Sequence, residues 1–178
     1  MIKKYISGKK IQQKVKELAK KVYKDYKKYN ELNIVTVLTG AKWFSKDFKK
    51  EIKGLGMKKV KEDFIKAKSY VGTKSSGRIN VIKDIKRNIA GKHILVIEDI
   101  VDTGLTLSFL KDYLLKKKKT RSVRICSFLD KPSRRVKKIK IDYCGFKVPN
   151  KFIVGYGLDF KEKYRGLHYI GVLVENKQ

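Results

Sequence analysis

Residues 94–107 (ILVIEDIVDTGLTL) constrain the fold of this chain more than any other stretch. The residues Ile94–Ile97 are all apolar, which is typical of a central parallel strand that is buried on both faces. This strand leads directly into Glu98 and Asp99, and a helical pattern begins at Leu105 after a short loop of small and hydroxyl residues. The stretch therefore predicts a strand–loop–helix unit with two carboxylates at the strand's carboxyl end, where open α/β sheets bind ligands.

The rest of the chain alternates between strand and helix patterns. Apolar residues recur at helical spacing from Ile11 to Tyr29, and further helices are expected at residues 41–52 and 105–115. Short apolar strands are expected at residues 33–38, 64–71, 79–82, 94–97, 123–129, 141–146, 152–154 and 169–174. This alternation predicts an α/β fold with a mostly parallel central sheet flanked by helices, and the late strands predict a small antiparallel hood. Because no Pro- or Gly-rich linker interrupts the chain, we expect one domain over residues 1–178.

The chain carries a formal net charge of +29, from 46 Lys and Arg against 17 Asp and Glu. Such a charge attracts phosphate-rich molecules, both small and polymeric. Only 7 of these cations are arginines, the type preferred for bidentate phosphate and base recognition, and the lysines are spread over the whole chain. We therefore interpret the charge as a solvated lysine-rich surface and do not expect specific nucleic-acid binding.

Several classes of protein are disfavoured. No stretch has the roughly 18 consecutive apolar residues of a membrane-spanning helix, and the first residues lack the apolar core of a secretory signal. Cys126 and Cys144 lie in apolar segments without the CxxC spacing of zinc or redox sites, so we expect free thiols and a cytoplasmic location. The motifs of P-loop NTPases, dinucleotide-binding folds, α/β-hydrolases and HExxH metalloproteases are also missing.

The loop at residues 102–106 (DTGLT) has the features of a phosphate site. Its backbone N–H groups precede a helix N-terminus, where the helix dipole adds positive charge, and its two threonines can donate hydroxyl hydrogen bonds. The neighbouring carboxylates would repel a phosphate unless they have other partners, such as a vicinal diol or magnesium. A helix-capping role would account for Asp102 but not for Glu98 and Asp99. The stretch thus predicts a site for a sugar that carries a phosphate and a ring diol.

The motif of apolar residues, Glu-Asp, two apolar residues and Asp-Thr-Gly-x-Thr resembles the signature of the phosphoribosyltransferases that use phosphoribosyl pyrophosphate (PRPP). Nearly the whole chain resembles their hypoxanthine-guanine branch, including VLTGAKWFSKDF at 37–48, DFIKAKSYVGTKSSGRINVI at 63–82 and VPNKFIVGYGLDFKEKYRGLHYIGVL at 148–173. The resemblance implies a type I phosphoribosyltransferase fold with a flexible hairpin lid. It also implies transfer of the phosphoribosyl group from PRPP to hypoxanthine or guanine in purine salvage, with Mg²⁺ as cofactor, in a homodimer or homotetramer.

The same resemblance assigns a role to each motif residue. Glu98 and Asp99 would hold the ribose hydroxyls, and with Asp159 they would meet magnesium. The ribose 5-phosphate would be bound by Asp102, Thr103, Gly104, Leu105 and Thr106. Asp102 would also lie near N7 of the purine as the general base, which makes the attacking ring nitrogen more nucleophilic as a ring proton leaves.

The resemblance also implies sites for the purine and the pyrophosphate. Lys131 would donate to the purine O6, which suits an ammonium because it only donates hydrogen bonds. The purine would further be bound by stacking on Phe152, by the main chain of Ile153 and by Asp159. Pyrophosphate would be bound by Thr39, Gly40 and Arg165, although many family members carry a lysine at the position of Thr39. Ser69 and Tyr70 match a pair on the mobile lid.

The sequence alone leaves alternatives open. It does not fix the preference among hypoxanthine, guanine and xanthine, and a pyrimidine transferase of the same superfamily is an alternative function. An RNA-binding regulator on the same fold is a rival of a different class. A receiver-like domain is disfavoured because no acceptor aspartate is well placed at the end of a different strand.

Overall fold

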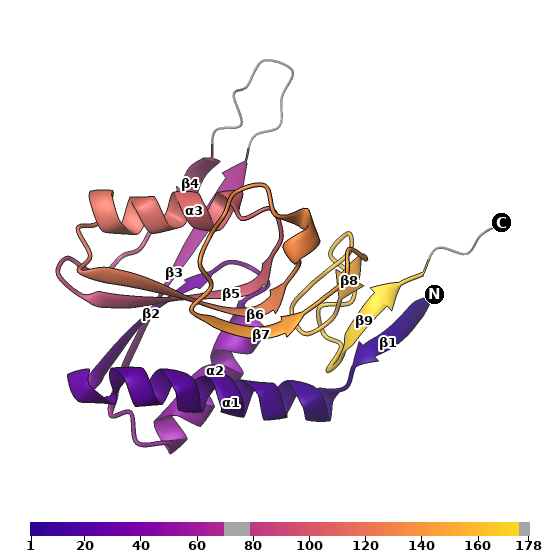
Figure 1. Cartoon of the computed structure of the whole chain (residues 1–178), viewed down its shortest axis with the longest axis horizontal. Coiled ribbons are helices and arrows are strands. Elements are labelled where there is room, and N and C mark those ends of the chain that lie inside the picture. Colours follow the sequence, from indigo (N-terminus) through magenta and orange to yellow (C-terminus); the bar gives the residue numbers. More distant parts are fainter. Residues whose placement is uncertain (70–78, 175–178) are drawn as a thin grey trace, which may run out of the picture.

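The computed structural model describes residues 1–69 and 79–174 of the chain (Figure 1). The helices are α1 (Gly8–Tyr26), α2 (Lys42–Gly54) and α3 (Leu105–Asp112), with the short turns η1 (Lys27–Tyr29), η2 (Tyr113–Lys117) and η3 (Pro132–Arg134). The strands are β1 (Ile2–Ile6), β2 (Glu31–Val37), β3 (Lys59–Ser69), β4 (Ile79–Lys83), β5 (His93–Val101), β6 (Ser122–Asp130), β7 (Tyr143–Lys147), β8 (Ile153–Val154) and β9 (Ile170–Leu173).

Six strands form the central sheet in the order β4-β3-β2-β5-β6-β7. All neighbours in this sheet are parallel except β3 and β4, which form an antiparallel pair. A separate antiparallel sheet, β1-β9-β8, lies at one end of the molecule and forms the hood (Figure 1). The expected fold class, a mostly parallel sheet with a small antiparallel hood, is confirmed.

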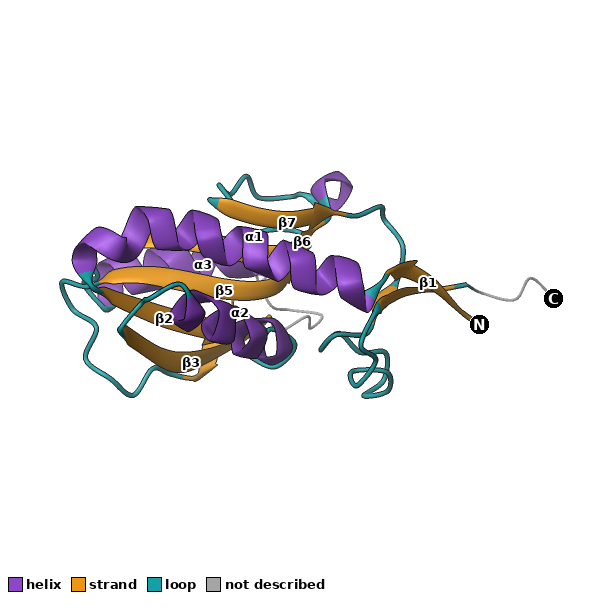
Figure 2. Ribbon diagram, turned by 90° about the horizontal axis from the view of Figure 1, so that it is seen from below, coloured by secondary structure: helices purple, strands orange, loops and turns teal. Residues whose placement is uncertain are grey.

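Helices cover both faces of the central sheet, with α1 and α2 side by side on one face and α3 on the other (Figure 2). The side chains of β5 alternate between the two resulting cores. Leu95 and Ile97 pack with α1 and α2, whereas Ile94 and Val96 pack with α3, and all four are at most 1% exposed. The apolar run at 94–97 is thus a central strand that is buried on both faces, as its sequence predicts.

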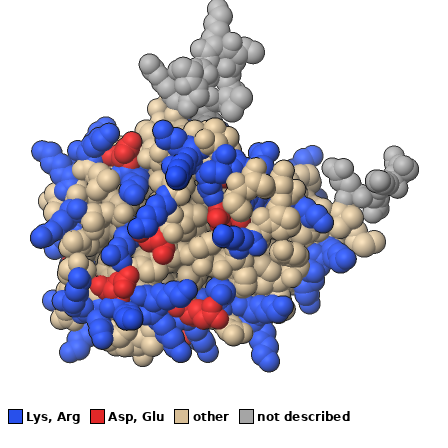
Figure 3. All heavy atoms as spheres, in the orientation of Figure 1, with Lys and Arg blue, Asp and Glu red and all other residues tan. Residues whose placement is uncertain are grey.

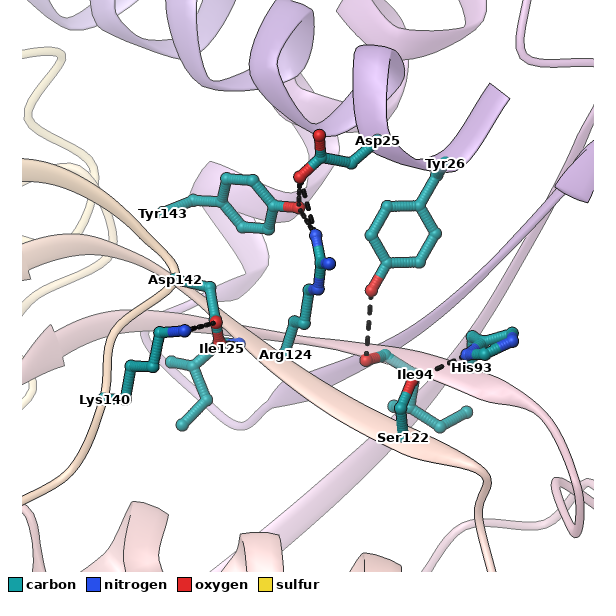
Figure 4. A network of polar contacts seen from close by, with 10 residues as sticks. All are labelled: Asp25, Tyr26, His93, Ile94, Ser122, Arg124, Ile125, Lys140, Asp142 and Tyr143. Atoms are coloured by element: carbon teal, nitrogen blue, oxygen red, sulfur yellow. Dashed lines mark hydrogen bonds and ion pairs between the residues drawn. The ribbon is translucent and has the colours of Figure 1, made fainter. Parts of the chain in front are cut away.

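A polar network fixes the end of α1 over β6 and β7 (Figure 4). Arg124 Nη1 lies 2.6 Å from Asp25 Oδ2, and Tyr143 Oη donates to the same oxygen at 2.7 Å. The hydrogen bond from Tyr143, together with the Arg124 guanidinium, holds the pKa of Asp25 below its usual value. Tyr26 Oη also donates to the Ile94 carbonyl at 3.5 Å, so the contacts of α1 reach the amino end of β5.

Several boundaries differ from those expected. The strand β1 was not predicted, and β5 continues through Glu98 and Asp99 to Val101 instead of ending at Ile97. The predicted helix at 105–115 changes from α to π geometry at Tyr113. Residues 64–69 of the predicted strand at 64–71 form the second half of β3, and residues 70–71 lie outside the described residues.

The structure shows the lysine-rich surface and the free thiols that the sequence predicts. Figure 3 shows Lys and Arg side chains distributed over the visible face, with few acidic side chains among them. Cys126 is buried, Cys144 is half-buried and both are free thiols. Among the described helices, none combines the length and the apolar composition that crossing a membrane requires.

Candidate active site

The two carboxylates at the end of β5 lie next to each other at the carboxyl edge of the sheet. Glu98 lines a pocket of about 220 Å³ together with the ends of β2 and β3 and with the loop at residues 102–106, which we call the DTGLT loop. Asp99 reaches the loop after β2, where a Cβ built on Gly40 would lie 1.7 Å from Asp99 Oδ2. A glycine is therefore required at position 40 for Asp99 to lie in this place. Glu98 thus faces the DTGLT loop and Asp99 faces the loop after β2, while the two carboxylates remain in contact with each other.

Glu98 is buried at this edge and Asp99 is half-buried. Glu98 is 7% exposed, and burial, followed by the charge of Asp99, raises its pKa well above the usual value. Burial also raises the pKa of Asp99, although the amide of Ile100 donates to its Oδ1 at 2.8 Å. Among the described residues, neither carboxylate is stabilised by a nearby cation. Such a pair is stabilised by a ligand that supplies hydroxyl donors or a positive charge.

The DTGLT loop is fixed in an open turn before α3. Gly104 has a φ of +82°, a left-handed conformation that glycine adopts without strain, and α3 begins at the next residue. A Cβ at this position would also lie 2.4 Å from the carbonyl oxygen of Lys137. The Leu105 amide donates to Thr103 Oγ1 at 3.4 Å, within the first turn of the helix. The loop therefore places its amides at the positive end of the α3 dipole, which favours an anion.

Asp102 and Lys131 are brought together by the ends of two neighbouring strands. The Lys131 amide donates to the Val101 carbonyl at 2.9 Å, which ties the end of β6 to the end of β5. Burial lowers the pKa of Lys131, the positive charge of Arg134 acts in the same direction, and the negative charge of Asp102 opposes both. Asp102 Oδ1 also accepts a hydrogen bond from Arg134 Nε at 3.1 Å.

Sequence reasoning missed Arg134. It belongs to a basic turn at residues 131–140, which is rich in cations, and its pattern does not separate it from solvated neighbours. A usable signal is the scarcity of arginine, because two of the seven arginines are adjacent here.

The long loop between β8 and β9 approaches Asp99 from the hood. Asp159 Oδ1 pairs with Arg165 Nη2 at 2.9 Å, and Asp159 Oδ2 accepts from the Glu162 amide at 2.8 Å. The negative charge of Asp159 contributes to the raised pKa of Asp99, so the two carboxylates are close in space. The structure therefore brings Asp99, Gly40, Asp159 and Arg165 to one side of the edge, and Thr39 lies exposed in the same loop as Gly40.

Two predicted purine-binding residues lie farther into the hood. Phe152 is 50% exposed, and its ring packs edge-on against Phe160 with the centroids 5.1 Å apart. It lines a second pocket of about 520 Å³, formed by residues between 151 and 174, which shares no residue with the pocket at Glu98. Ile153 is buried in β8. Of the predicted lid pair, Ser69 is the last residue of β3, and Tyr70 lies outside the described residues.

The donor set fits magnesium held largely by substrate. Within residues 1–69 and 79–174, no group of three or more His, Cys, Asp or Glu side chains is arranged as a metal cage. Magnesium usually keeps waters and binds through one or two carboxylates plus substrate phosphates. The half-buried carboxylate of Asp99, facing Asp159 and without a cationic partner among the described residues, suits such a shared site.

Comparison with known protein families and curated proteins gives one consistent result. Residues 1–161 match the family model of the phosphoribosyl transferase domain. The chain is 46% identical to the hypoxanthine-guanine phosphoribosyltransferase of Bacillus subtilis, over 94% of this chain and 91% of that protein. It is 45% identical to the bifunctional protein TilS/HprT of Listeria monocytogenes over 94% of this chain, but it spans only 25% of that longer protein.

Solved structures agree in fold. The hypoxanthine-guanine phosphoribosyltransferase of Bacillus anthracis superposes with a TM-score of 0.89 at 43% identity, over 98% of this chain and 100% of that one. The hypoxanthine phosphoribosyltransferase of Trypanosoma cruzi, solved with the product IMP, gives a TM-score of 0.87 at 34% identity over 96% of this chain and 93% of that one. By the family model, by identity over nearly its whole length and by its fold, this chain belongs to the hypoxanthine-guanine phosphoribosyltransferase family.

Proposed function

We propose that this protein catalyses a step of purine salvage, in which the 5-phosphoribosyl group of PRPP is transferred to hypoxanthine or guanine. The products are IMP or GMP and pyrophosphate. One observation carries the proposal: two desolvated carboxylates, an anion-binding loop and the Asp102–Lys131 pair meet at the carboxyl edge of one sheet. Each of these features has a matching group on one of the two substrates.

The ribose 5-phosphate is bound between β5 and α3. Glu98 and Asp99 accept hydrogen bonds from the ribose hydroxyls, which replace the water that both carboxylates have lost. The residues of the DTGLT loop, Asp102 to Thr106, bind the phosphate through their amides and hydroxyls at the start of α3. Binding of PRPP therefore stabilises charges that are costly in the empty site.

The purine is selected by the group at its position 6. Lys131 donates to a 6-oxo group and is mismatched with a 6-amino group, because an ammonium cannot accept a hydrogen bond. Phe152, Ile153 and Asp159 complete the purine site from the hood. The relative from Tritrichomonas foetus, 42% identical over 93% of this chain, is a hypoxanthine-guanine-xanthine phosphoribosyltransferase, so xanthine belongs in any test of selectivity.

The transfer exchanges one bond at C1′ for another. A purine ring nitrogen bonds to C1′ as the bond from C1′ to the pyrophosphate oxygen breaks, and a ring proton passes to Asp102. Thr39, Gly40 and Arg165 bind the leaving pyrophosphate, and the negative carboxylates below the ribose stabilise positive charge at C1′. Glu98, Asp99 and Asp159 would hold magnesium together with substrate oxygens, and the bound ion would supply neutralisation of charge on the pyrophosphate. Ser69 and Tyr70 belong to the lid that excludes water.

Family membership also supports a proposal on the domain organisation, the location and the assembly of the enzyme. We infer that residues 1–178 form one catalytic domain, since both cores are built on a single central sheet. We further infer a cytoplasmic enzyme that assembles as a homodimer or homotetramer.

A substrate panel tests the proposed function. The full chain is assayed with PRPP and Mg²⁺ against hypoxanthine, guanine, xanthine, adenine and uracil, and nucleotide and pyrophosphate are both measured. We expect turnover with hypoxanthine or guanine and none with adenine or uracil. Turnover with uracil alone would contradict the proposal. Tight, sequence-selective RNA binding without any transferase activity would favour a regulator on the same fold.

A further inference from the structure

Two adjacent arginines follow β6 and pair with aspartates from two different strand ends. Arg134 Nε donates to Asp102 Oδ1 at 3.1 Å, just after β5. Arg135 Nη2 pairs with the carboxylate of Asp130, the last residue of β6, whose side chain is 10% exposed. The chain has 7 arginines among 46 cations, so two of them in succession at one turn distinguish this turn from the general basic surface.

The same segment holds the DTGLT loop through its main chain. The Thr103 carbonyl accepts hydrogen bonds from the amides of Val136 and Lys137, both at 2.9 Å. On the other side of this contact, Gly104 packs so closely that a Cβ built on it would lie 3.1 Å from Arg135 Cδ and 3.3 Å from Arg135 Nη1. Residues 134–137 therefore contact three consecutive residues of the DTGLT loop, and we call them the arginine brace.

The two arginines act on different parts of the site. Arg134 occupies Oδ1 of Asp102, which leaves Oδ2 as the oxygen that can accept a proton from a substrate. Arg135 contacts the turn at Gly104, and its pairing with Asp130 anchors the guanidinium to the end of β6. A planar guanidinium with several donors can pair with a carboxylate and pack against backbone at the same time, whereas a lysine ammonium offers a single charged point.

We propose that Arg134 and Arg135 are positioning residues with separate targets. Arg134 fixes the orientation of the Asp102 carboxylate for proton abstraction, and Arg135 fixes the shape of the DTGLT loop that binds the 5-phosphate of PRPP. This inference rests on the proposed function and extends it to a segment that touches neither substrate. It requires that loss of Arg134 and loss of Arg135 damage different kinetic constants.

Steady-state kinetics of the full chain with Mg²⁺ test this division. For Arg134→Gln we expect kcat to fall about 10-fold, as for loss of one charge-assisted hydrogen bond, with the KM for PRPP within about 2-fold of wild type. For Arg135→Gln we expect the KM for PRPP to rise about 10-fold, with kcat within about 2-fold. Arg121→Gln is the matched control, because Arg121 precedes β6 at the opposite edge of the sheet, and both constants should stay unchanged.

Conservative variants separate positioning from loss of folding. Arg135→Lys keeps a positive charge for Asp130 but loses the planar contact with Gly104, so we expect an intermediate rise in the KM for PRPP. Arg134→Lys keeps a donor near Asp102, and we expect kcat to recover in part. Calorimetric titration with PRPP and Mg²⁺, without a purine, should show weakened binding for both Arg135 variants and wild-type binding for both Arg134 variants.

The outcomes distinguish this inference from the proposed function. A wild-type chain without turnover on any base would overturn both. An active wild type in which the two glutamine variants change kcat and KM in the same proportion would overturn the brace alone, as would equal effects in Arg121→Gln. If Arg135→Gln does not fold, unchanged PRPP affinity in Arg135→Lys would have the same meaning.

Discussion

The two edges of the central sheet treat their carboxylates in opposite ways. At the amino edge, Glu31 pairs with Lys61 at 2.7 Å and accepts from Asn33 at 2.9 Å, and these contacts lower its pKa to about 2. At the carboxyl edge, burial raises the pKa of Glu98 and of Asp99. The negative charge of Glu31 is stabilised by partners within the protein, whereas no cation among the described residues stabilises a negative charge on Glu98 or Asp99. This contrast marks the carboxyl edge as the functional one.

The largest expected effect is at the carboxyl edge. Asp102→Asn should lower kcat at least about 100-fold, because an amide cannot accept the ring proton as a general base does. The affinity for PRPP should change little, since the DTGLT loop keeps its backbone. Rapid-quench measurement of the chemical step, together with calorimetry for PRPP, checks both parts. Equal turnover of the variant and the wild type would contradict the assignment of Asp102 as the base.

A smaller effect is expected for Lys131 at the carboxyl edge of the sheet, with Lys92 at the amino edge as its control. Lys131→Ala should raise the KM for hypoxanthine about 10-fold through loss of a charged donor, with a smaller change in the KM for PRPP. Lys92→Ala is the matched variant at the amino edge, where Lys92 pairs with Glu31 at 3.4 Å, and it should leave both constants unchanged. An unchanged KM for hypoxanthine in Lys131→Ala would remove the basis for 6-oxopurine selection.

Stability should respond in opposite directions at the two edges. Glu98→Gln should raise the unfolding free energy of the substrate-free protein by about 1 kcal/mol, because it removes a buried carboxyl group that faces the negative charge of Asp99, while turnover falls. Glu31→Gln should lower the unfolding free energy by about 1 kcal/mol and leave turnover unchanged. Urea unfolding followed by circular dichroism measures both. A stabilising effect of Glu31→Gln would contradict the structural role assigned to Glu31.

The contributions of Glu98 and Glu31 to stability should depend on pH in opposite ways. The raised pKa of Glu98 means that the folded state binds a proton more tightly than the unfolded state, so this residue's contribution to stability rises as the pH falls toward 4.5. The lowered pKa of Glu31 acts in reverse: its stabilisation is present above pH 4.5 and is lost as the pH falls toward about 2. We expect each glutamine variant to lack the part of the wild-type pH dependence that comes from the replaced carboxyl group. Measuring the unfolding free energy of both variants and the wild type across this pH range checks this.

The smallest expected effect concerns the loop after β2. Thr39→Lys adds a cation at an exposed position where many family members have one, so the gain should be limited to that of an exposed ion pair. We expect the KM for PRPP to fall about 3-fold, a change of about 0.6 kcal/mol by the same principle, with no change in the KM for hypoxanthine. A higher KM for PRPP would show that this loop does not meet the pyrophosphate.

The predictable parts of the fold are those that local pattern determines. The run at Ile94–Ile97 predicts its own burial, since no polar side chain interrupts it. The strand β1 escapes prediction because Ile6 is its only fully buried residue and its partner β9 lies more than 160 residues away, with Ile2 opposite Leu173. Pairing at such a distance depends on the whole fold and leaves little trace in the local sequence.

The candidate site shows the same division. The DTGLT loop and its carboxylates follow from one continuous stretch, and the structure places them at one edge. The contacts of Arg134 with Asp102 and of Arg165 with Asp159 depend on how two turns fold back, and a basic turn in a chain of +29 gives no sign of which cation will pair. The roles of Phe152 and Ile153 rest on the family resemblance, because Phe152 lines a pocket separate from that of Glu98 and Ile153 is buried in β8.

The pairing of β1 with β9 has a consequence for synthesis on the ribosome. Residues 2–6 leave the exit tunnel more than 160 residues before the strand that they pair with, residues 170–173. A nascent chain that has reached Lys137 already contains the DTGLT loop and the whole arginine brace, whereas β1 still has an unpaired edge. The exposed side chains of this strand discourage aggregation of its edge until β9 has been synthesised; they are Lys3, Lys4 and Tyr5.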